Sequence, residues 1–123
     1  MDRELHLKLT IRLYSDDDRR CFDRGIAMLL AQVQEHHSLR AASASMGMAY
    51  CKACKILRTA EDVFGCKLLH STTGGPHGGG AVLTPEAERL LAAYRAYQAD
   101  VDRYARERFE EAFGFYRDLD QEP

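Results

Sequence analysis

Residues 72–84 read TTGGPHGGGAVLT, and this stretch decides how the fold is interpreted. A short strand-like run, KLLHS at 67–71, precedes the loop TTGGPHGGG, and a second run, AVLT at 81–84, follows it. The five glycines of the loop free the backbone to adopt positive φ angles and to approach another surface without side-chain clashes. A phosphate backbone is such a surface. The pattern therefore predicts a β-hairpin wing that contacts nucleic acid.

The glycine-rich loop has two other interpretations. A nucleotide-binding loop would join a strand to a helix and carry a GK[ST] signature, whereas these glycines lie between two strand-like runs. Nucleotide binding is therefore disfavoured. A merely flexible linker stays an alternative.

Helical periodicity predicts three helices before the wing. The first ends near His36 and has an apolar face made of Phe22, Ile26, Leu29, Leu30 and Val33. Ser38 is suited to cap a second helix over 39–46, Gly47 supplies a turn, and a third helix runs from about 49 to 64. Small side chains in the second helix permit close packing against a neighbour, namely Ala41, Ala42 and Ala44.

The third predicted helix has one basic face. Its apolar side contains Ala53, Ile56, Leu57, Ala60 and Phe64, and its outward side contains Cys51, Lys52, Lys55, Arg58 and Asp62. Between residues 36 and 85, five Lys and Arg oppose two acids, a net +3, although the whole chain carries −2. A glycine-containing turn followed by a basic helix is typical of a helix that enters the DNA major groove. From the helices alone, a solvated charged face on an ordinary helical domain stays an alternative.

The N-terminal residues predict a strand. From 5 to 14, apolar residues alternate strictly with polar ones, as in LHLKLTIRLY, until the charged run SDDDRR breaks the pattern. The chain has 123 residues, 46% of them hydrophobic and 29% charged, which predicts one globular domain. No stretch approaches the roughly 18 apolar residues of a membrane span, and the charged N-terminus does not resemble a signal peptide, so we expect a cytoplasmic protein.

A long amphipathic helix is predicted after the wing. Pro85 is suited to begin it and Gly114 to end it, a length of about 28 residues. A seam at steps of four and three is typical of helix pairing, and Leu90, Tyr94, Tyr97, Val101 and Tyr104 form such a seam. Phe109 extends it, and these residues together predict a dimer. The alternative is that this helix packs on the first helix of its own chain. The predicted division is a DNA-binding domain over 1–84 and a dimerisation helix and tail over 85–123.

Catalytic and metal chemistry have little support in the sequence. No nucleophile, base and orienting group share a recognisable spacing, so we expect no enzyme and no cofactor. Cys51 and Cys54 form a CxxC pair, but no second such pair follows, and we expect no metal site. The four cysteines are expected to be reduced thiols.

Two segments together resemble a known family. SLRAASASMGMAY at 38–50 with the basic helix after it, and TTGGPHGGGAVLTPEAERLL at 72–91, resemble the N-terminal domain of ModE-type molybdate regulators, which is related to the winged helix of LysR-type regulators. The resemblance covers about residues 5–100. It implies that the third helix lies in the major groove, that the wing touches the DNA backbone or minor groove, and that the last helix joins the first in dimerisation. The residues that it implies contact DNA are Ser38, Arg40, Tyr50, Lys52, Lys55, Thr73, Gly74 and Gly75.

The sequence therefore predicts a mainly α fold with a small β-sheet (α+β), a winged helix-turn-helix with an N-terminal strand and a long C-terminal helix. The predicted function is sequence-specific transcriptional regulation by a homodimer on double-stranded DNA, with Cys51, Arg58 and His77 added to the contacts. A winged-helix module that pairs with another regulator, without strong DNA binding, is the alternative. We expect no molybdate binding, because one amphipathic helix follows Pro85 where the family has an oxyanion-binding domain. No membrane partner is expected.

Overall fold

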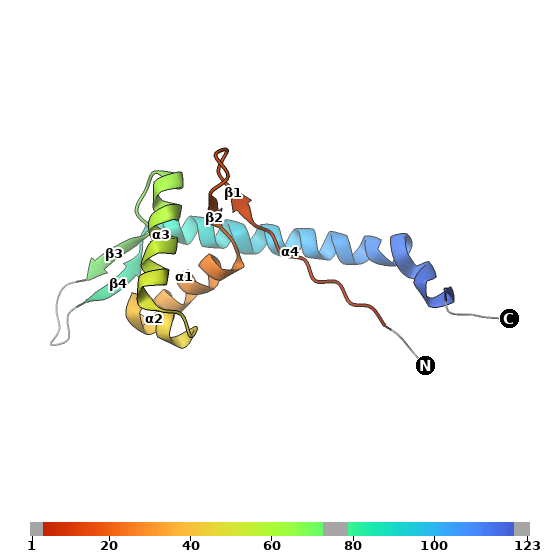
Figure 1. Ribbon diagram of the computed structural model, residues 1–123, viewed down its shortest axis with the longest axis horizontal. Helices are drawn as coiled ribbons and strands as arrows, with labels where there is room; N and C mark the ends of the chain where they lie inside the picture. Colours follow the sequence, from red (N-terminus) through yellow and green to blue (C-terminus); the bar gives the residue numbers. More distant parts are fainter. Residues whose placement is uncertain (1–3, 73–78, 120–123) are drawn as a thin grey trace.

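The computed structural model describes residues 4–72 and 79–119. Within these ranges the fold is mainly helical, with two small antiparallel hairpins and one long helix that extends well past the rest of the molecule (Figure 1). It is a winged helix-turn-helix of the α+β class, as predicted. The elements are β1 (Leu13–Tyr14), β2 (Arg20–Phe22), α1 (Arg24–His36), α2 (Leu39–Ser45), α3 (Tyr50–Phe64), β3 (Leu69–Thr72), β4 (Gly80–Leu83), α4 (Pro85–Phe113) and the 3-10 helix η1 (Gly114–Asp118).

The helix-turn-helix forms as predicted. Ser38 caps α2, because its side-chain oxygen accepts a hydrogen bond from the Ala41 amide at 3.1 Å. Gly47 makes the turn with a φ of +66°, a backbone conformation that glycine adopts without strain. The predicted packing face of α2 is partly wrong. Ala42 is buried together with Ser43, whereas Ala41 and Ala44 are exposed, since the helix is only seven residues long and turns one narrow face to the core.

The core lies where α1, α3, the wing and the start of α4 meet. Every predicted apolar residue of the first helix is buried, although Phe22 belongs to β2 rather than to the helix. In α3 the buried positions are Ala53, Leu57 and Ala60, while Ile56 and Phe64 are half-buried. The spacing of these residues leaves the opposite face of α3 to solvent.

The predicted wing hairpin is present, with strand bounds that differ by one or two residues from the expected ones. Leu69 pairs with Leu83 and Thr72 with Gly80. The base of the hairpin is held twice, because the Thr84 amide donates to the Leu68 carbonyl at 3.0 Å and the Thr84 hydroxyl to the Lys67 carbonyl at 2.8 Å.

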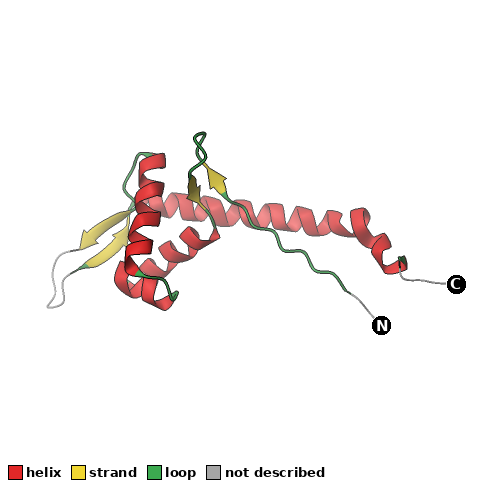
Figure 2. Cartoon of the chain, in the orientation of Figure 1, coloured by secondary structure: helices red, strands yellow, loops and turns green. Residues whose placement is uncertain are grey.

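The predicted strand over 5–14 is wrong as a paired strand. Only Leu13–Tyr14 pair, with β2, across a turn in which Asp18 has a φ of +67°. Residues 4–12 are extended but pair with no strand in the described chain, and they run alongside α4 (Figure 2). The alternation correctly indicates an extended backbone, but among the described residues β2 pairs with Leu13–Tyr14 and no strand pairs with residues 4–12.

The long helix α4 has 29 residues and is capped by the Thr84 hydroxyl, which accepts from the Ala87 amide at 3.1 Å. Its first turns pack into the core, where Ala87, Leu91 and Tyr94 are buried. Its second half projects beyond the core, and the N-terminal segment runs beside it (Figure 1). The described helices include none that is long and apolar enough to cross a membrane.

Candidate nucleic-acid interface

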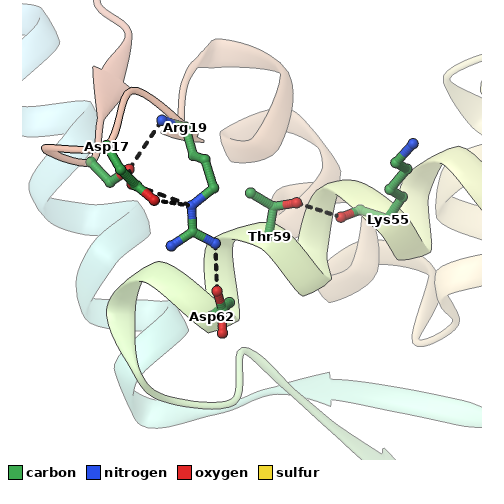
Figure 3. A network of polar contacts seen from close by, with 6 residues as sticks. Asp17, Arg19, Lys55, Thr59 and Asp62 are labelled. Atoms are coloured by element: carbon green, nitrogen blue, oxygen red, sulfur yellow. Dashed lines mark hydrogen bonds and ion pairs between the residues drawn. The ribbon is translucent and has the colours of Figure 1, made fainter.

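The outward face of α3 is basic. Lys52, Lys55 and Arg58 are exposed on the side of α3 opposite its buried residues. Among the residues that the structure describes, these three bases take part in no ion pair. The Thr59 hydroxyl donates to the Lys55 carbonyl at 3.1 Å, so it bonds along its own helix, while the Lys55 ammonium stays in solvent (Figure 3).

Both acids of α3 are occupied by hydrogen bonds. Asp62, at the far end of the outward face, is bound by the guanidinium of Arg19, which also contacts Asp17 at 3.1 Å (Figure 3). The hydrogen bond to Asp62 is the main reason that the pKa of Arg19 is raised above its ordinary value. Glu61 is half-buried and accepts from the Leu68 amide at 2.9 Å. The free charge on this face is therefore positive.

An arginine and an aromatic ring stack beside the start of α3. The Arg40 guanidinium carbon lies 4.0 Å from the centre of the Tyr50 ring, a cation–π contact that joins α2 to α3. The neighbouring Cys54 thiol raises the pKa of the Tyr50 phenol, and the nearby charge of Arg40 opposes that shift. The contact with Tyr50 holds the planar guanidinium of Arg40 at the same end of α3 as Lys52. Arg40 and Lys52 are both exposed there.

Other predicted contacts have different positions. The side-chain oxygen of Ser38 is engaged in capping α2, and Cys51 is exposed on the outward face of α3. The wing residues Thr73, Gly74, Gly75 and His77 lie outside the described residues. Their sequence remains the only basis for the roles proposed for them.

One basic residue near this face was not among the predicted contacts. Lys67 is exposed and lines a shallow hollow together with Arg58 at the end of α3. Lys67 counts toward the positive charge of residues 36–85, but only the fold shows that the start of the wing returns beside α3.

The wing is tied to the helix-turn-helix. His37 ends α1 with a φ of +58°, and its carbonyl accepts from the Ala81 amide of β4 at 2.9 Å. Gly80 lies at the same contact, because a Cβ there would stand 3.3 Å from the His37 carbonyl oxygen and 2.1 Å from Thr72 Oγ1. This hydrogen bond fastens β4 to the end of α1, directly before α2.

The predicted seam of α4 divides into two parts. Tyr94 is buried against Phe22, with ring centres 5.2 Å apart, and Leu90 is half-buried beside the core, so packing within the chain accounts for this part. Tyr97 and Tyr104 are 59% and 62% exposed on the projecting part. The remaining two seam residues, Val101 and Phe109, are half-buried.

No cluster of possible metal ligands occurs in the described ranges. There, no three His, Cys, Asp or Glu side chains come together as metal ligands would. Cys21 is buried, and burial raises the pKa of its thiol, while Cys54 and Cys66 are half-buried. The outward face of α3 therefore offers the positively charged, hydrogen-bond-donating side chains of Lys52, Lys55 and Arg58.

Comparison with known proteins identifies distant relatives. No protein-family model matches the chain. The chain is 34% identical to the molybdenum-pterin-binding protein MopB of Rhodobacter capsulatus over 98 residues, covering 69% of this chain and 36% of the relative. It is 36% identical to the molybdenum transport protein ModE of Herbaspirillum seropedicae over 92 residues, covering 75% of this chain and 31% of the relative.

A third relative carries a functional name. The transcriptional regulator ModE of Haemophilus influenzae is 33% identical over 90 residues, covering 73% of this chain and 32% of the relative. The chain thus spans about a third of the length of the relatives that it matches. None of the three names describes an enzyme. The chain is a distant homologue of ModE-type regulators, related to their N-terminal region.

Proposed function

We propose that this protein is a sequence-specific DNA-binding transcriptional regulator that acts as a homodimer. The observation that carries the proposal is the outward face of α3, where Lys52, Lys55 and Arg58 are exposed and unpaired within the described chain while both acids of the helix are bound elsewhere. Basic side chains on the second helix of a helix-turn-helix are suited to the negatively charged major groove of DNA. The relative named as a transcriptional regulator supports the same function.

The basic side chains on this face are proposed to have different roles that depend on their position along α3. Lys52 lies in the first turn of α3, beside the Arg40–Tyr50 stack, where side chains of a recognition helix reach base edges. Lys55 lies one turn further along. Arg58 and Lys67 lie together at the far end, where contact with phosphates is expected. Cys51 and Ser38 complete the surface at the near end.

The wing is proposed to contact the DNA backbone or minor groove. The bond between His37 and Ala81 holds the hairpin against the helix-turn-helix, so strands β3 and β4 belong to the same domain as α3. Thr73, Gly74, Gly75 and His77 are the proposed contacts on the strength of their sequence.

The projecting half of α4 is proposed to form the dimer. Tyr97 and Tyr104 expose aromatic surface that a second copy would cover, and Val101 and Phe109 extend the same stripe. Leu90 and Tyr94 are left out of this interface because they serve the core of their own chain. The division into a DNA-binding unit over 1–84 and a dimerisation helix from 85 remains part of the proposal, with the first turns of α4 also completing the core.

Molybdenum appears in the names of two relatives, but we propose no molybdate site in residues 85–119. These residues form one helix and a short 3-10 turn, which provide no enclosed pocket for an oxyanion. Stoichiometric micromolar binding of molybdate by the purified chain, measured by calorimetry, would overturn this part of the proposal.

Selection of bound sequences from random duplex DNA tests the function. A dimer with two recognition helices should enrich an inverted repeat whose half-sites are about 10 base pairs apart. Circular dichroism of the same preparation verifies that the protein is folded. Failure of the folded protein to enrich any sequence would overturn the proposal and favour a protein-interaction module.

A further inference from the structure

Among the described residues, the N-terminal segment is held to α4 and η1 by one edge of its backbone. The Tyr94 hydroxyl donates to the Ile11 carbonyl at 2.7 Å, and the Gln98 amide donates to the Leu9 carbonyl at 3.1 Å. Nearer the N-terminus, Arg106 donates to the Leu7 carbonyl at 3.4 Å, and the Leu5 amide donates to the Tyr116 hydroxyl at 3.0 Å. Every backbone group in these bonds belongs to an odd-numbered residue.

This parity defines a second, free edge. In an extended chain the N–H and C=O of one residue point to the same side, and those of the next residue point to the opposite side. The groups of His6, Lys8 and Thr10 therefore point away from α4. In the described part of the chain they make no hydrogen bond, and all three residues are exposed. An uncovered strand edge of this kind is a template for pairing with another chain.

We propose that this edge pairs, antiparallel, with the same segment of a second copy across a twofold axis. The inference rests on the proposed homodimer and assigns it a second contact besides α4. An antiparallel pair of identical strands is closed by a twofold rotation, so both free edges are used and none remains for further growth. Residues 5–12 alternate strictly and pair with no strand in the described part of the chain, and a partner strand then explains their alternation.

The register follows from the side chains. The two free edges meet whenever the pairing is centred on a residue, and centres at residues 8, 9 and 10 use most of the segment. Pairing about Lys8 places two lysines directly opposite each other, and pairing about Thr10 places Lys8 opposite the partner's Arg12. Both registers are disfavoured, because like charges directly opposite each other are destabilising. Pairing about Leu9 sets Lys8 opposite the partner's Thr10. It also sets every leucine and isoleucine of residues 5–13 opposite another.

The area that a stable dimer needs agrees with a combined interface. Specific interfaces bury about 800 Å² on each partner, which two short strands alone do not reach. Leu7–Thr10 also form one wall of a groove of about 720 Å³ whose other walls are α1 and α4. Leu5, which is 54% exposed, and the exposed tyrosines of α4 add apolar surface on the same projecting part of the molecule.

A proline at the free edge tests the pairing. Thr10→Pro removes an amide from each strand of the proposed ribbon, whereas the matched control Thr10→Ala removes the side chain and keeps the amide. Sedimentation equilibrium of the full chain should show a dimer dissociation constant raised about tenfold or more by the proline, and within about twofold of wild type for the alanine. A monomeric wild type, or equal dissociation constants for the two variants, would overturn the proposal.

A cross-link tests the register without destabilising the strand. In a Cys51→Ser background, Leu9→Cys should form a covalent dimer under mild oxidation, because residues that face each other in a non-hydrogen-bonded pair have Cα atoms about 4.5 Å apart. Leu7→Cys, whose proposed neighbour is the partner's Ile11, should not. Equal cross-linking of both, or of neither, would overturn the register. Selection of DNA by the wild-type protein tests the proposed function separately. If Leu9→Cys does not cross-link while the wild type still selects DNA, only the strand pairing is wrong.

Discussion

Gly80→Ala is expected to disturb the junction between the wing and the helix-turn-helix. The added Cβ would lie 2.1 Å from Thr72 Oγ1 and 3.3 Å from the His37 carbonyl oxygen. The Thr72 side chain can rotate away, but the backbone carbonyl has to shift by a few tenths of an ångström and with it the bond to Ala81. Overpacking of this kind costs about 1–3 kcal/mol, and we expect the free energy of unfolding to fall by about 1–2 kcal/mol.

A double-mutant cycle separates the two contacts. Thr72→Ala removes the hydroxyl that the new methyl group would meet, so Gly80→Ala in that background should cost less by about 1 kcal/mol. Urea unfolding at one fixed protein concentration measures all four proteins, because dimerisation makes stability depend on concentration. If Gly80→Ala is neutral, or costs the same with and without the Thr72 hydroxyl, the account of this junction is wrong.

Three further predictions follow from the interface and the core. Lys52→Ala should make the free energy of DNA binding less favourable by about 1–3 kcal/mol and relax the preference at one base pair, whereas Arg58→Ala should lower the affinity for all sequences similarly. If both variants lose affinity equally for every sequence, the division of roles is wrong. Tyr94→Phe removes the hydrogen bond to the N-terminal segment and should lower the free energy of unfolding by about 1 kcal/mol in urea, while Tyr97→Phe should change nothing; equal stabilities would contradict the role given to that bond. Replacing Tyr97 and Tyr104 together with serine should shift the protein toward monomer in light scattering, with unchanged circular dichroism, and an unchanged dimer would exclude this stripe.

Local sequence patterns predicted most of the helices and the wing because the relevant interactions are close in sequence. Ser38 caps a helix that begins at the next residue, and Gly47 makes its turn alone. The hairpin of β1 and β2 was missed. The three residues of β2, RCF, are too few to show an alternating pattern, and SDDDRR indicates only a turn. Contacts between distant residues, such as Arg19 with Asp62, have no local signal.

Periodicity could not show which partner covers an apolar residue. Tyr94 and Tyr97 both fit the seam of α4, yet the first is buried in the chain's own core and the second is exposed. The same limit explains the N-terminal segment, whose alternation predicts an extended backbone but not the chain that pairs with it. Lys67 joins the basic surface only because the fold returns the chain to the end of α3.

The salt dependence of DNA affinity tests the central claim most directly. Replacing Arg58 and Lys67 with alanine should weaken binding to a selected site and flatten the slope of log K against log salt by about two units, because each of these two proposed phosphate contacts contributes about 0.9. The charge-matched control replaces Arg103 and Arg108 on the projecting part of α4, both exposed, and should leave the slope unchanged. Equal slopes for wild type and both double variants would contradict the assignment of the outward face of α3 as the DNA-binding surface.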